Sequence, residues 1–520
     1  MGIKMLESVE ELPPKIIAVI DIGTNSIRSA IAQAYDDGRV EALEELALAV
    51  WFGRDTFQRG GLSSQSMRAG IDILRKFQRK FVQYRVEKIR AVATAGIREA
   101  GNADIFIDRV RIATGLEIEI IDPAEEIQYS VLAVLDTVDD AFAAQGKNIL
   151  IVDVGGGNTL LSIVRDGAVV FSQSLNIGAI RMREFLADPN DTPQNNAAIY
   201  RHNILEILNS AEAYFPFSGI DYYVMMGGDA RFAAKQVGES SVFESLMEIS
   251  LPRFDTFVKR CLKKEPQRLC REYGITFKEA ETTVPALLTY QEIARKTGLQ
   301  TILVSPATMR QGLLMDLTRS VWGLENGLLQ RDVLDAAKSL AQKYHVDLEL
   351  AECTSMLAAR VFDEMKAEHG LGARYRLLLQ VAALLQNAGR FVSNRSFHKH
   401  TLYLINNSEI FGLRRAETEL VAYIARYSCQ SAPKVSHAGF MSLSRESRVL
   451  ISKLAAMLRI ADALNHGKPP AAASIRFERE GDELSLYLPP DDTFLLKVRS
   501  LEKQGKMFED VFGMKVSFFS

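Results

Sequence analysis

The sequence predicts an α/β protein in which two lobes of the same plan enclose a cleft, followed by an all-α domain and a small α+β domain. Three observations support this prediction. A strand-turn-strand pattern occurs twice, helical periodicity dominates after about residue 319, and short apolar runs return after residue 473. The 520 residues, 47% of them apolar, are too many for a single core. We predict domains at residues 1–137, 138–318, 319–472 (all-α) and 473–520 (β-rich).

The repeated pattern is an apolar strand that ends in Asp, a turn of small residues and two further strands. The first copy begins at residue 15 and places Asp21 at the end of its first strand. The second copy begins at residue 148 and places Asp153 at the corresponding position. The turn residues are Gly23, Thr24, Asn25 and Ser26 in the first copy and Gly155, Gly156, Gly157 and Asn158 in the second.

Glycine-rich turns of this kind suit a phosphate, because a backbone without Cβ atoms can approach an anion closely and point its N–H groups at it. One such turn is more often an ordinary hairpin, but two copies with Asp in the same place favour a ligand site. A duplicated α/β domain would bring both turns to opposite walls of one cleft. The pattern predicts a phosphate between the turns, with Asp21 and Asp153 near Mg²⁺ or Mn²⁺. The alternative is that each Asp only caps its turn.

Several segments between residues 15 and 318 resemble motifs of the Ppx/GppA family, in consistent order. They are Asp21–Arg28 and Asp153–Thr159 as two phosphate motifs, Thr94–Asn102 as T-x-A-x-R-x-A-x-N, Asp122–Glu126 as the paired acids, Met225–Gly228, and Ser305–Leu313 as S-x-x-x-x-R-x-G-L. The resemblance implies two ribonuclease H-like lobes, the plan shared by actin, Hsp70 and the sugar kinases. It also implies a cytoplasmic enzyme that acts on phosphoanhydrides.

Hydrolysis of a phosphoanhydride requires a held phosphoryl group, charge neutralisation and an oriented water. The resemblance implies that Arg98 clamps the phosphoryl group with its planar guanidinium and that Glu126 activates the water. Taken alone, Arg98 is typical of a surface ion pair, and Glu125 and Glu126 are typical of the acidic first turn of a helix that starts after Asp122. The resemblance favours a catalytic role for Glu126 and a structural role for Glu125.

The sequence departs from the family pattern at Leu160, where the second phosphate motif of the family ends in glutamate. The site is therefore one acid short, and we expect weaker metal binding or slower turnover. A long polyphosphate would also need a basic channel that leads away from the turns. The candidates are Arg28, Lys259, Arg260, Lys263 and Lys264. For the last four residues the alternative is a solvated helix face.

The segment after residue 319 resembles a helical domain of the HD type. The positions that would hold metal ions there are Leu350, Gln386, Asn387 and Asp462. One carboxylate cannot hold a catalytic metal, so we predict that this domain positions substrate or forms the contact of a homodimer. Predicted helices cover Asp332–Tyr344, Thr354–Glu368, Arg374–Ala388 and Ser447–Leu464, and predicted strands cover Ser474–Glu480, Glu483–Leu488 and Phe494–Val498.

The overall charge excludes some partners. A formal net charge of −3 is not that of a protein that coats nucleic acid or an anionic membrane. The four cysteines form no CxxC pair, which predicts reduced thiols in the cytoplasm. Residues 1–14 contain no apolar stretch typical of an export leader, and no segment approaches the roughly 18 apolar residues of a membrane span.

These observations predict an exopolyphosphatase that releases orthophosphate from the end of inorganic polyphosphate. A guanosine pentaphosphate phosphohydrolase is the second hypothesis, because the same site could hydrolyse that nucleotide. It ranks second because the sequence contains no motif that recognises guanine. A sensor that binds polyphosphate or a guanosine alarmone without efficient cleavage is the third, because of Leu160. A sugar kinase is disfavoured, since the chain has no P-loop and no candidate sugar-site aspartate.

Overall fold

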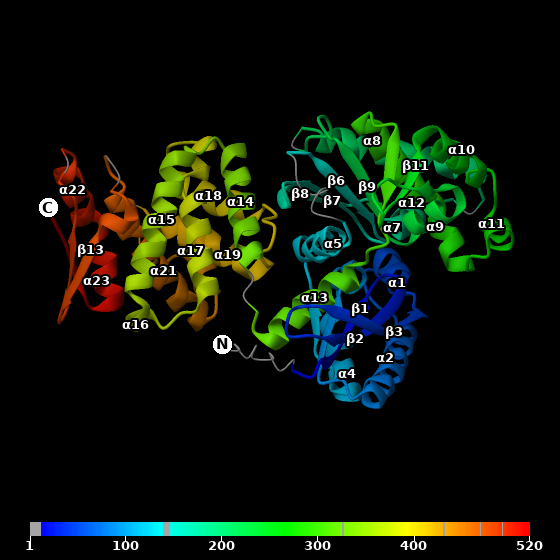
Figure 1. The fold of residues 1–520 in the computed structure, drawn as a ribbon, viewed down its shortest axis with the longest axis horizontal. Coiled ribbons are helices and arrows are strands. Elements are labelled where there is room, and N and C mark those ends of the chain that lie inside the picture. The colour runs from blue at the N-terminus through cyan, green and yellow to red at the C-terminus, as the bar shows by residue number, and fades with distance from the viewer. Residues whose placement is uncertain are drawn as a thin grey trace, which may run out of the picture. The chain divides into compact units, whose positions relative to one another are not determined.

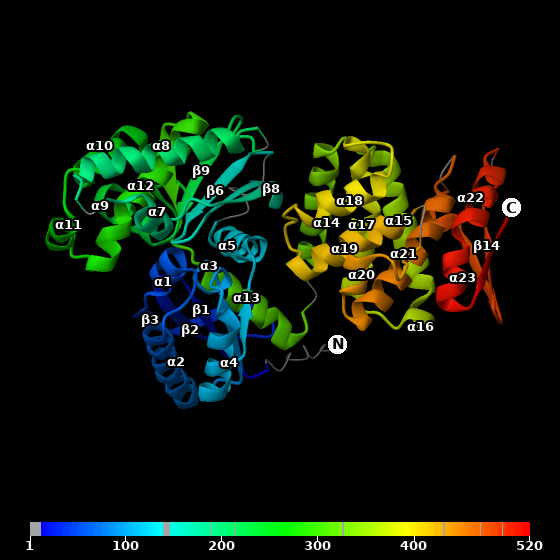
Figure 2. The ribbon, with the colours of Figure 1, turned by 180° about the vertical axis from the view of Figure 1, so that it is seen from behind.

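The computed structural model describes residues 12–138, 146–188, 190–213, 215–324, 327–429, 432–467, 470–490 and 492–520. The chain divides into two compact units, residues 1–326 and 327–520, which are drawn in Figures 1 and 2. The prediction that no export leader is present rests mainly on residues 1–11, which lie outside the described residues. None of the helices in the described ranges has the length and apolar character needed to span a bilayer.

Two sheets with equivalent strand order build the first unit. The first sheet runs β3-β2-β1-β4-β5, and the second runs β8-β7-β6-β9-β12 with β11 and β10 added at the edge. The first sheet consists of β1 (Lys15–Ile22), β2 (Ser26–Ala34), β3 (Val40–Ala49), β4 (Lys88–Ala93) and β5 (Ile118–Ile120). The second consists of β6 (Ile149–Val154), β7 (Thr159–Arg165), β8 (Ala168–Leu175), β9 (Tyr222–Met226), β10 (Glu239–Ser240), β11 (Met247–Ser250) and β12 (Thr301–Val304). The repeated order confirms the predicted pair of α/β lobes.

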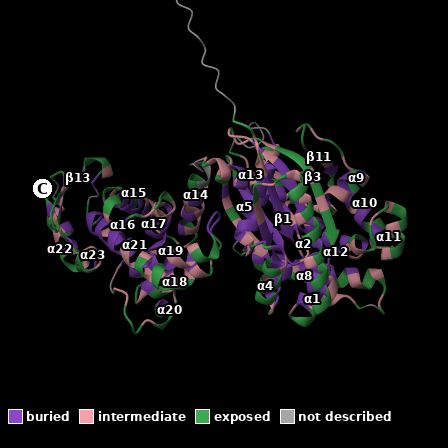
Figure 3. Ribbon diagram, turned by 90° about the horizontal axis from the view of Figure 1, so that it is seen from below, coloured by how far each residue is buried: buried purple, intermediate pink, exposed green. Residues whose placement is uncertain are grey.

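Strand β1 lies in the middle of its sheet and supplies two apolar cores. Because successive side chains point to opposite faces, Ala18 and Ile20 join one core while Ile17 and Val19 join the other. Helices α2 (Ser64–Tyr84) and α4 (Ala103–Thr114) cover the first face, and α5 (Pro123–Thr137) and α13 (Met309–Trp322) cover the second. In Figure 3 the buried residues gather in the strands and on the inner faces of these helices.

One apolar core of the second lobe lies between its sheet and a layer of helices. The helices are α7 (Ala179–Leu186), α8 (Pro193–Ala211), α9 (Gly228–Val237), α10 (Leu251–Cys261), α11 (Pro266–Tyr273) and α12 (Phe277–Thr297). The first lobe also has two short helices near the cleft, α1 (Phe52–Arg59) and α3 (Ala95–Arg98). Helices α1 and α7 pack against each other, so each lobe contributes a helix beside its glycine turn.

Helices α5 and α13 lie side by side between the two sheets (Figures 1 and 2). They approach closely at Gly312, where a Cβ atom would lie 2.0 Å from the Tyr129 carbonyl oxygen. Before α13 begins, Ser305 extends β12 by donating its N–H to Met225 O. Thr308 then caps the helix in a capping box with Gln311.

The second unit contains a helical region with a small sheet at its carboxyl end, as predicted. Its helices are α14 (Gly327–Lys343), α15 (Leu348–Glu364), α16 (Lys366–His369), α17 (Ala373–Leu385), α18 (Phe397–Asn406), α19 (Arg415–Tyr427), α20 (Ala438–Met441) and α21 (Arg445–Leu464). The terminal elements are β13 (Arg476–Glu480), β14 (Glu483–Tyr487), α22 (Phe494–Gln504), α23 (Lys506–Phe512) and β15 (Lys515–Phe519). The boundaries of the four domains that the sequence predicts stay a prediction.

The predicted strand Phe494–Val498 is wrong, because these residues begin helix α22. Phe494, Val498 and Leu501 recur at intervals of four and three, which places them on the face of the helix that packs against the core. Lys497 on this helix is fully buried, and its Nζ donates to Thr493 Oγ1. The third strand of the sheet is instead β15, which pairs in parallel with β14.

Candidate active site

A cleft of about 460 Å³ opens between the two lobes of the first unit. Both glycine turns line it, together with Asp21, Arg28, Glu126 and Asp153. The fold therefore brings the two copies of the repeated motif to opposite walls of one cavity. The turn residues that line it are Gly23, Thr24, Asn25, Ser26, Gly155, Gly156, Gly157 and Asn158.

The two turns have the same hydrogen-bond pattern. The Gly23 N–H donates to Ser26 O over 3.0 Å, and the Gly155 N–H donates to Asn158 O over 2.9 Å. Carbonyl oxygens of both turns accept bonds from backbone N–H groups near α1 and α7; Gly53 N–H donates to Thr24 O, for example. Within the described ranges, no protein group accepts a bond from the N–H of Thr24, Asn25, Gly156 or Gly157.

This pattern narrows the set of donors that could hold an anion. Gly23 and Gly155 were predicted to bind phosphate, but their N–H groups are used to close the turns. Their lack of a side chain still permits close approach of a ligand. The N–H groups left for an anion are those of the central residues of each turn, which is the arrangement of a backbone anion nest.

The two turns lie almost in contact across the cleft. A Cβ atom on Gly156 would lie 2.1 Å from Thr24 Oγ1 and 2.6 Å from Ile180 Cδ1. Any residue larger than glycine at position 156 would clash with the side chains of Thr24 and Ile180 unless these moved. The requirement for glycine here is steric, since the two walls meet at this point.

Among the carboxylates that line the cleft, those of Asp21, Glu126 and Asp153 have raised pKa values. Burial raises the pKa of Glu126 to about 7, against the Arg98 guanidinium, while Asp21 and Asp153 raise it further. Burial also raises the pKa of Asp21, opposed by Arg28 and Arg310. The pKa of Asp153 is raised by burial as well. Buried carboxyls whose pKa values are raised favour a bound proton or a cation beside them.

Helix α5 positions Glu126 through its first turn. Asp122 caps the helix by accepting the Glu125 N–H over 3.0 Å, and Glu125 Oε2 accepts the Asp122 N–H over 3.3 Å. Glu126 points to the cleft, and its Oε1 accepts a 2.6 Å bond from Arg98 Nη1. Arg98 does not itself line the cleft, and the same Nη1 also donates to Ile121 O.

Further cleft residues were not singled out from the sequence as site residues. The charged ones are the cations Arg231, Lys278 and Arg310 and the acids Asp229 and Glu279. Arg310 is nine-tenths buried, and its Nη1 lies 3.9 Å from Asp21 Oδ2. Arg310 is the arginine of the S-x-x-x-x-R-x-G-L segment, and Asp229 directly follows the glycine pair. Their positions in or beside family motifs could therefore have identified both as site residues. Lys278 had none.

The predicted basic channel remains a prediction. Of its five residues only Arg28 lines the cleft. Lys259 and Arg260 lie in the last turn of α10, and both are exposed. Lys264 donates to Tyr273 Oη over 3.0 Å and pairs with Glu272, so its charge is already partnered.

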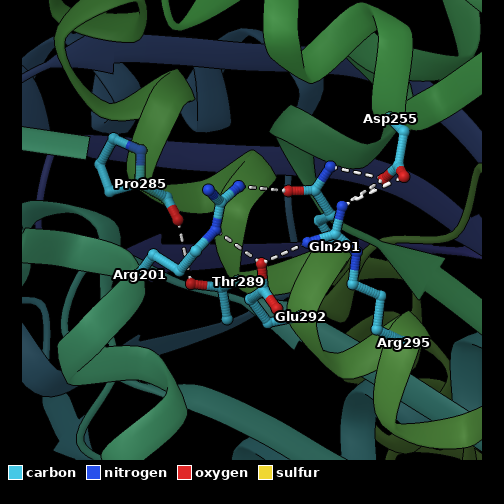
Figure 4. A network of polar contacts seen from close by, with 7 residues as sticks. All are labelled: Arg201, Asp255, Pro285, Thr289, Gln291, Glu292 and Arg295. Carbon is cyan, nitrogen blue, oxygen red and sulfur yellow. Dashed lines mark hydrogen bonds and ion pairs between the residues drawn. The ribbon is translucent and has the colours of Figure 1, made fainter. Parts of the chain in front are cut away.

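A network of hydrogen bonds and ion pairs links helix α12 to its neighbouring helices (Figure 4). The same helix carries Lys278 at the end that lies beside the cleft. Arg201 on α8 donates to Gln291 Oε1 over 3.0 Å and to Glu292 Oε1 over 2.8 Å. Asp255 on α10 accepts bonds from Gln291 and Arg295. Gln291 and Glu292 are almost fully buried, so the network holds α12 firmly against two neighbouring helices.

Asp21 and Asp153 could bind a divalent cation whose other ligands are waters and substrate oxygens. No group of three or more His, Cys, Asp or Glu ligands occurs among the described residues. Mg²⁺ usually keeps several waters and takes only one or two carboxylates plus substrate phosphates, and Asp21 and Asp153 meet that need. Leu160 pairs directly opposite Asp153 and is buried, which shows where the carboxylate of the family motif would have been.

In the second unit, amides surround the carboxylate that the sequence analysis aligned with a metal ligand. Gln386 Nε2 and Gln504 Nε2 donate to the two oxygens of Asp462 over 3.1 and 2.9 Å. Asn465 Nδ2 donates to Leu350 O and to Thr354 Oγ1. Of the aligned positions, Gln386 and Asp462 are therefore in direct contact, and both carboxylate oxygens of Asp462 accept bonds from neutral amides.

Comparison with known proteins gives consistent matches. Residues 31–321 match the model of the Ppx/GppA phosphatase family, and residues 334–504 match domain III of the Ppx/GppA phosphatases. The chain is 24% identical over 477 residues to a guanosine-5'-triphosphate,3'-diphosphate pyrophosphatase of Vibrio atlanticus, covering 89% of each chain.

Two crystal structures share the fold of the first unit. An exopolyphosphatase of Cytophaga hutchinsonii is 22% identical with a TM-score of 0.52, over 59% of this chain and 98% of that one. An exopolyphosphatase-like protein is 19% identical with a TM-score of 0.53, over 60% and 99% of the two chains.

Proposed function

The chain belongs to the Ppx/GppA phosphatase family, and from this premise we propose that its cleft hydrolyses the terminal phosphoanhydride of a polyphosphorylated substrate. The observation that carries the proposal is the position of Glu126. Its carboxylate, with a pKa raised to about 7, lies in the cleft that the two nests of free backbone N–H groups also line. That combination suits a general base beside a bound phosphoryl group.

In the proposed reaction the terminal phosphoryl group lies between the two turns. The N–H groups of Thr24, Asn25, Gly156 and Gly157 donate to its oxygens. Ionised Glu126 accepts a proton from a water in line with the anhydride bond. The water oxygen bonds to phosphorus, the bridging oxygen leaves with the shortened substrate, and orthophosphate is released.

We propose that Asp21 and Asp153 hold Mg²⁺, or Mn²⁺ in its place, together with substrate oxygens. The cation would neutralise charge on the phosphates. Arg310 and Arg28 would neutralise further charge from the first lobe, since both line the cleft and both influence Asp21. Arg98 acts on Glu126 by keeping its carboxylate oriented, because it donates to Oε1 directly.

Two findings move guanosine pentaphosphate ahead of inorganic polyphosphate as the proposed substrate. The first is the name of the relative from Vibrio atlanticus, which matches along 89% of this chain. The second is Asp229, a carboxylate in the cleft wall that accepts a 3.1 Å bond from Thr283 Oγ1. A carboxylate can accept bonds from the O–H and N–H groups of a nucleoside, but it repels a chain that carries only phosphates.

The test is phosphate release by the purified protein with magnesium, from guanosine pentaphosphate and from long-chain polyphosphate. We expect faster release from the nucleotide, and Asp229→Asn should shift the ratio of the two rates towards polyphosphate. Preference of the wild type for polyphosphate would restore the order predicted from the sequence. Tight binding of either substrate without release would instead indicate a sensor.

We also propose that the protein is a cytoplasmic homodimer. The four cysteines are free thiols, which fits a reducing compartment. Sedimentation at several concentrations tests the dimer, and a monomer at all of them would rule it out.

A further inference from the structure

An ion pair crosses the cleft beside the second glycine turn. Arg181, on α7 of the second lobe, donates from Nη2 to both oxygens of Glu99, at 2.6 and 2.7 Å. Glu99 directly follows α3 of the first lobe. The Arg181 side chain is only 18% exposed, so the pair is partly shielded from water. Because its partners come from opposite lobes, the pair exists only while the lobes are together.

Arg181 also holds the backbone of the glycine turn. Its Nε donates to Gly157 O over 2.6 Å, and its own N–H donates to Gly156 O over 3.0 Å. Its guanidinium lies 4.4 Å from the centre of the Phe57 ring. In a planar peptide the C=O and the following N–H point in opposite directions. Backbone N–H groups of α7 hold Gly156 O, so the Arg181 side chain acts on Gly157 O, and fixing that carbonyl orients the Asn158 N–H of the same peptide group to the opposite side.

Glu99 adjoins the arginine that orients the proposed base. Arg98 donates to Glu126, and Glu99 pairs with Arg181. Two consecutive residues therefore contact the proposed base and the arginine that bonds the second glycine turn. Two further side-chain contacts join the lobes in this arrangement. Lys278 lies 3.5 Å from the centre of the Trp51 ring, and Gln58 bonds to Glu184.

We propose that Glu99 and Arg181 are positioning residues, whose ion pair holds the Gly157 carbonyl, and with it the second glycine turn, in the conformation that binds the phosphoryl group when the lobes close. This inference rests on the proposed function. It predicts that Glu99 acts through Arg181 and not through contact with the substrate. The two side chains should therefore behave as one unit in kinetics.

The kinetic test uses Glu99→Gln, Arg181→Gln and the double variant, assayed for phosphate release. Each single change should lower kcat/KM on the order of tenfold, and the double variant should lose little more than the worse single one. Glu239→Gln is the matched control, because it breaks an ion pair with Arg253 outside the cleft lining. It should leave kcat/KM unchanged. Effects that multiply in the double variant, or single variants with full activity, would overturn the proposal.

A second measurement needs no turnover. Amide hydrogen exchange of residues 153–160 should become faster in Glu99→Gln, with or without inorganic phosphate, while exchange in β1 stays unchanged. Glu99→Asp, which keeps the charge, should retain part of the protection and serves if Glu99→Gln folds poorly. Unchanged exchange at the turn would refute the positioning role. A wild type that releases no phosphate but shows the predicted exchange would refute only the proposed function.

Discussion

Two neighbouring acids in the first turn of α5 have different surroundings. Glu125 closes a capping box with Asp122, so its charge stabilises the start of the helix. Glu126 points into the cleft, where burial and two further carboxyls raise its pKa to about 7. The sequence alone suggested that both acids only stabilise the first turn of a helix. That interpretation fits Glu125, whereas Glu126 lines the cleft.

The first prediction concerns the rate of phosphate release by Glu126→Gln. We expect a loss of about 10²–10⁴-fold in kcat, because the amide cannot accept a proton from water. In the wild type kcat/KM should rise with pH and level off above about 7, since the base must be ionised. Glu125→Gln, its neighbour in the same turn, should keep both kcat and the pH profile. A wild-type profile with no limb near pH 7 would contradict the assignment.

The second prediction concerns stability and pH at the same residue. The pKa of Glu126 is higher in the folded protein than in the unfolded chain, so folding binds a proton between about pH 4.5 and 7. Its contribution to the free energy of unfolding is therefore favourable in acid and is lost as pH rises through 7. Glu126→Gln should be more stable than wild type at pH 8, by up to about 3 kcal/mol. Urea unfolding at pH 5 and pH 8 would test this, and an equal difference at both would refute it.

The third prediction concerns Arg310, which is nine-tenths buried and lies beside Asp21. Lysine keeps the charge but cannot donate two parallel bonds to a phosphate. We expect Arg310→Lys to raise KM roughly tenfold with a smaller change in kcat, as for a group that binds ground and transition states alike. Arg253→Lys, outside the cleft lining, is the control. A fall in kcat at constant KM would instead indicate a contact made only in the transition state.

At the scale of elements, the position of Glu126 depends on how α5 packs against α13. The two helices meet at Gly312, whose Cα faces the Tyr129 carbonyl. Tyr129 in turn accepts a 2.7 Å bond from Arg90, which also pairs with Asp316 on α13. The crossing helices are thereby tied to the first lobe, and α5 carries the proposed base from there to the cleft.

The fourth prediction follows from this crossing. Gly312→Ala places a methyl group 2.0 Å from the Tyr129 oxygen, a backbone atom that cannot move alone. Overpacking of this kind costs roughly 1–3 kcal/mol in the free energy of unfolding, which chemical denaturation would measure. Gly228→Ala is the matched control, since a Cβ there meets nothing within 4 Å. Equal stability of the two variants would show that the helices separate without cost.

For the whole molecule, activity should depend on metal while the fold should not. The cores of the two lobes are apolar and independent of the cleft carboxylates. The fifth prediction is that a chelator abolishes phosphate release, that Mg²⁺ or Mn²⁺ restores it, and that the thermal midpoint stays unchanged. Activity that survives chelation would show that Arg28, Arg310 and Lys278 neutralise the phosphates without a cation.

The duplicated strand and turn pattern, the fold class and the residues of both glycine turns could all be predicted from the sequence. These features depend on neighbours within a few positions, because strand alternation and turn chemistry are local. The same local view failed at Phe494–Val498, where an apolar run fits a strand or a helix. Which distant side chains meet became visible only in the packed molecule. Arg231 and Lys278 line the cleft, and Arg181 reaches Glu99 of the other lobe, because the two lobes pack together, and no local pattern contains that packing.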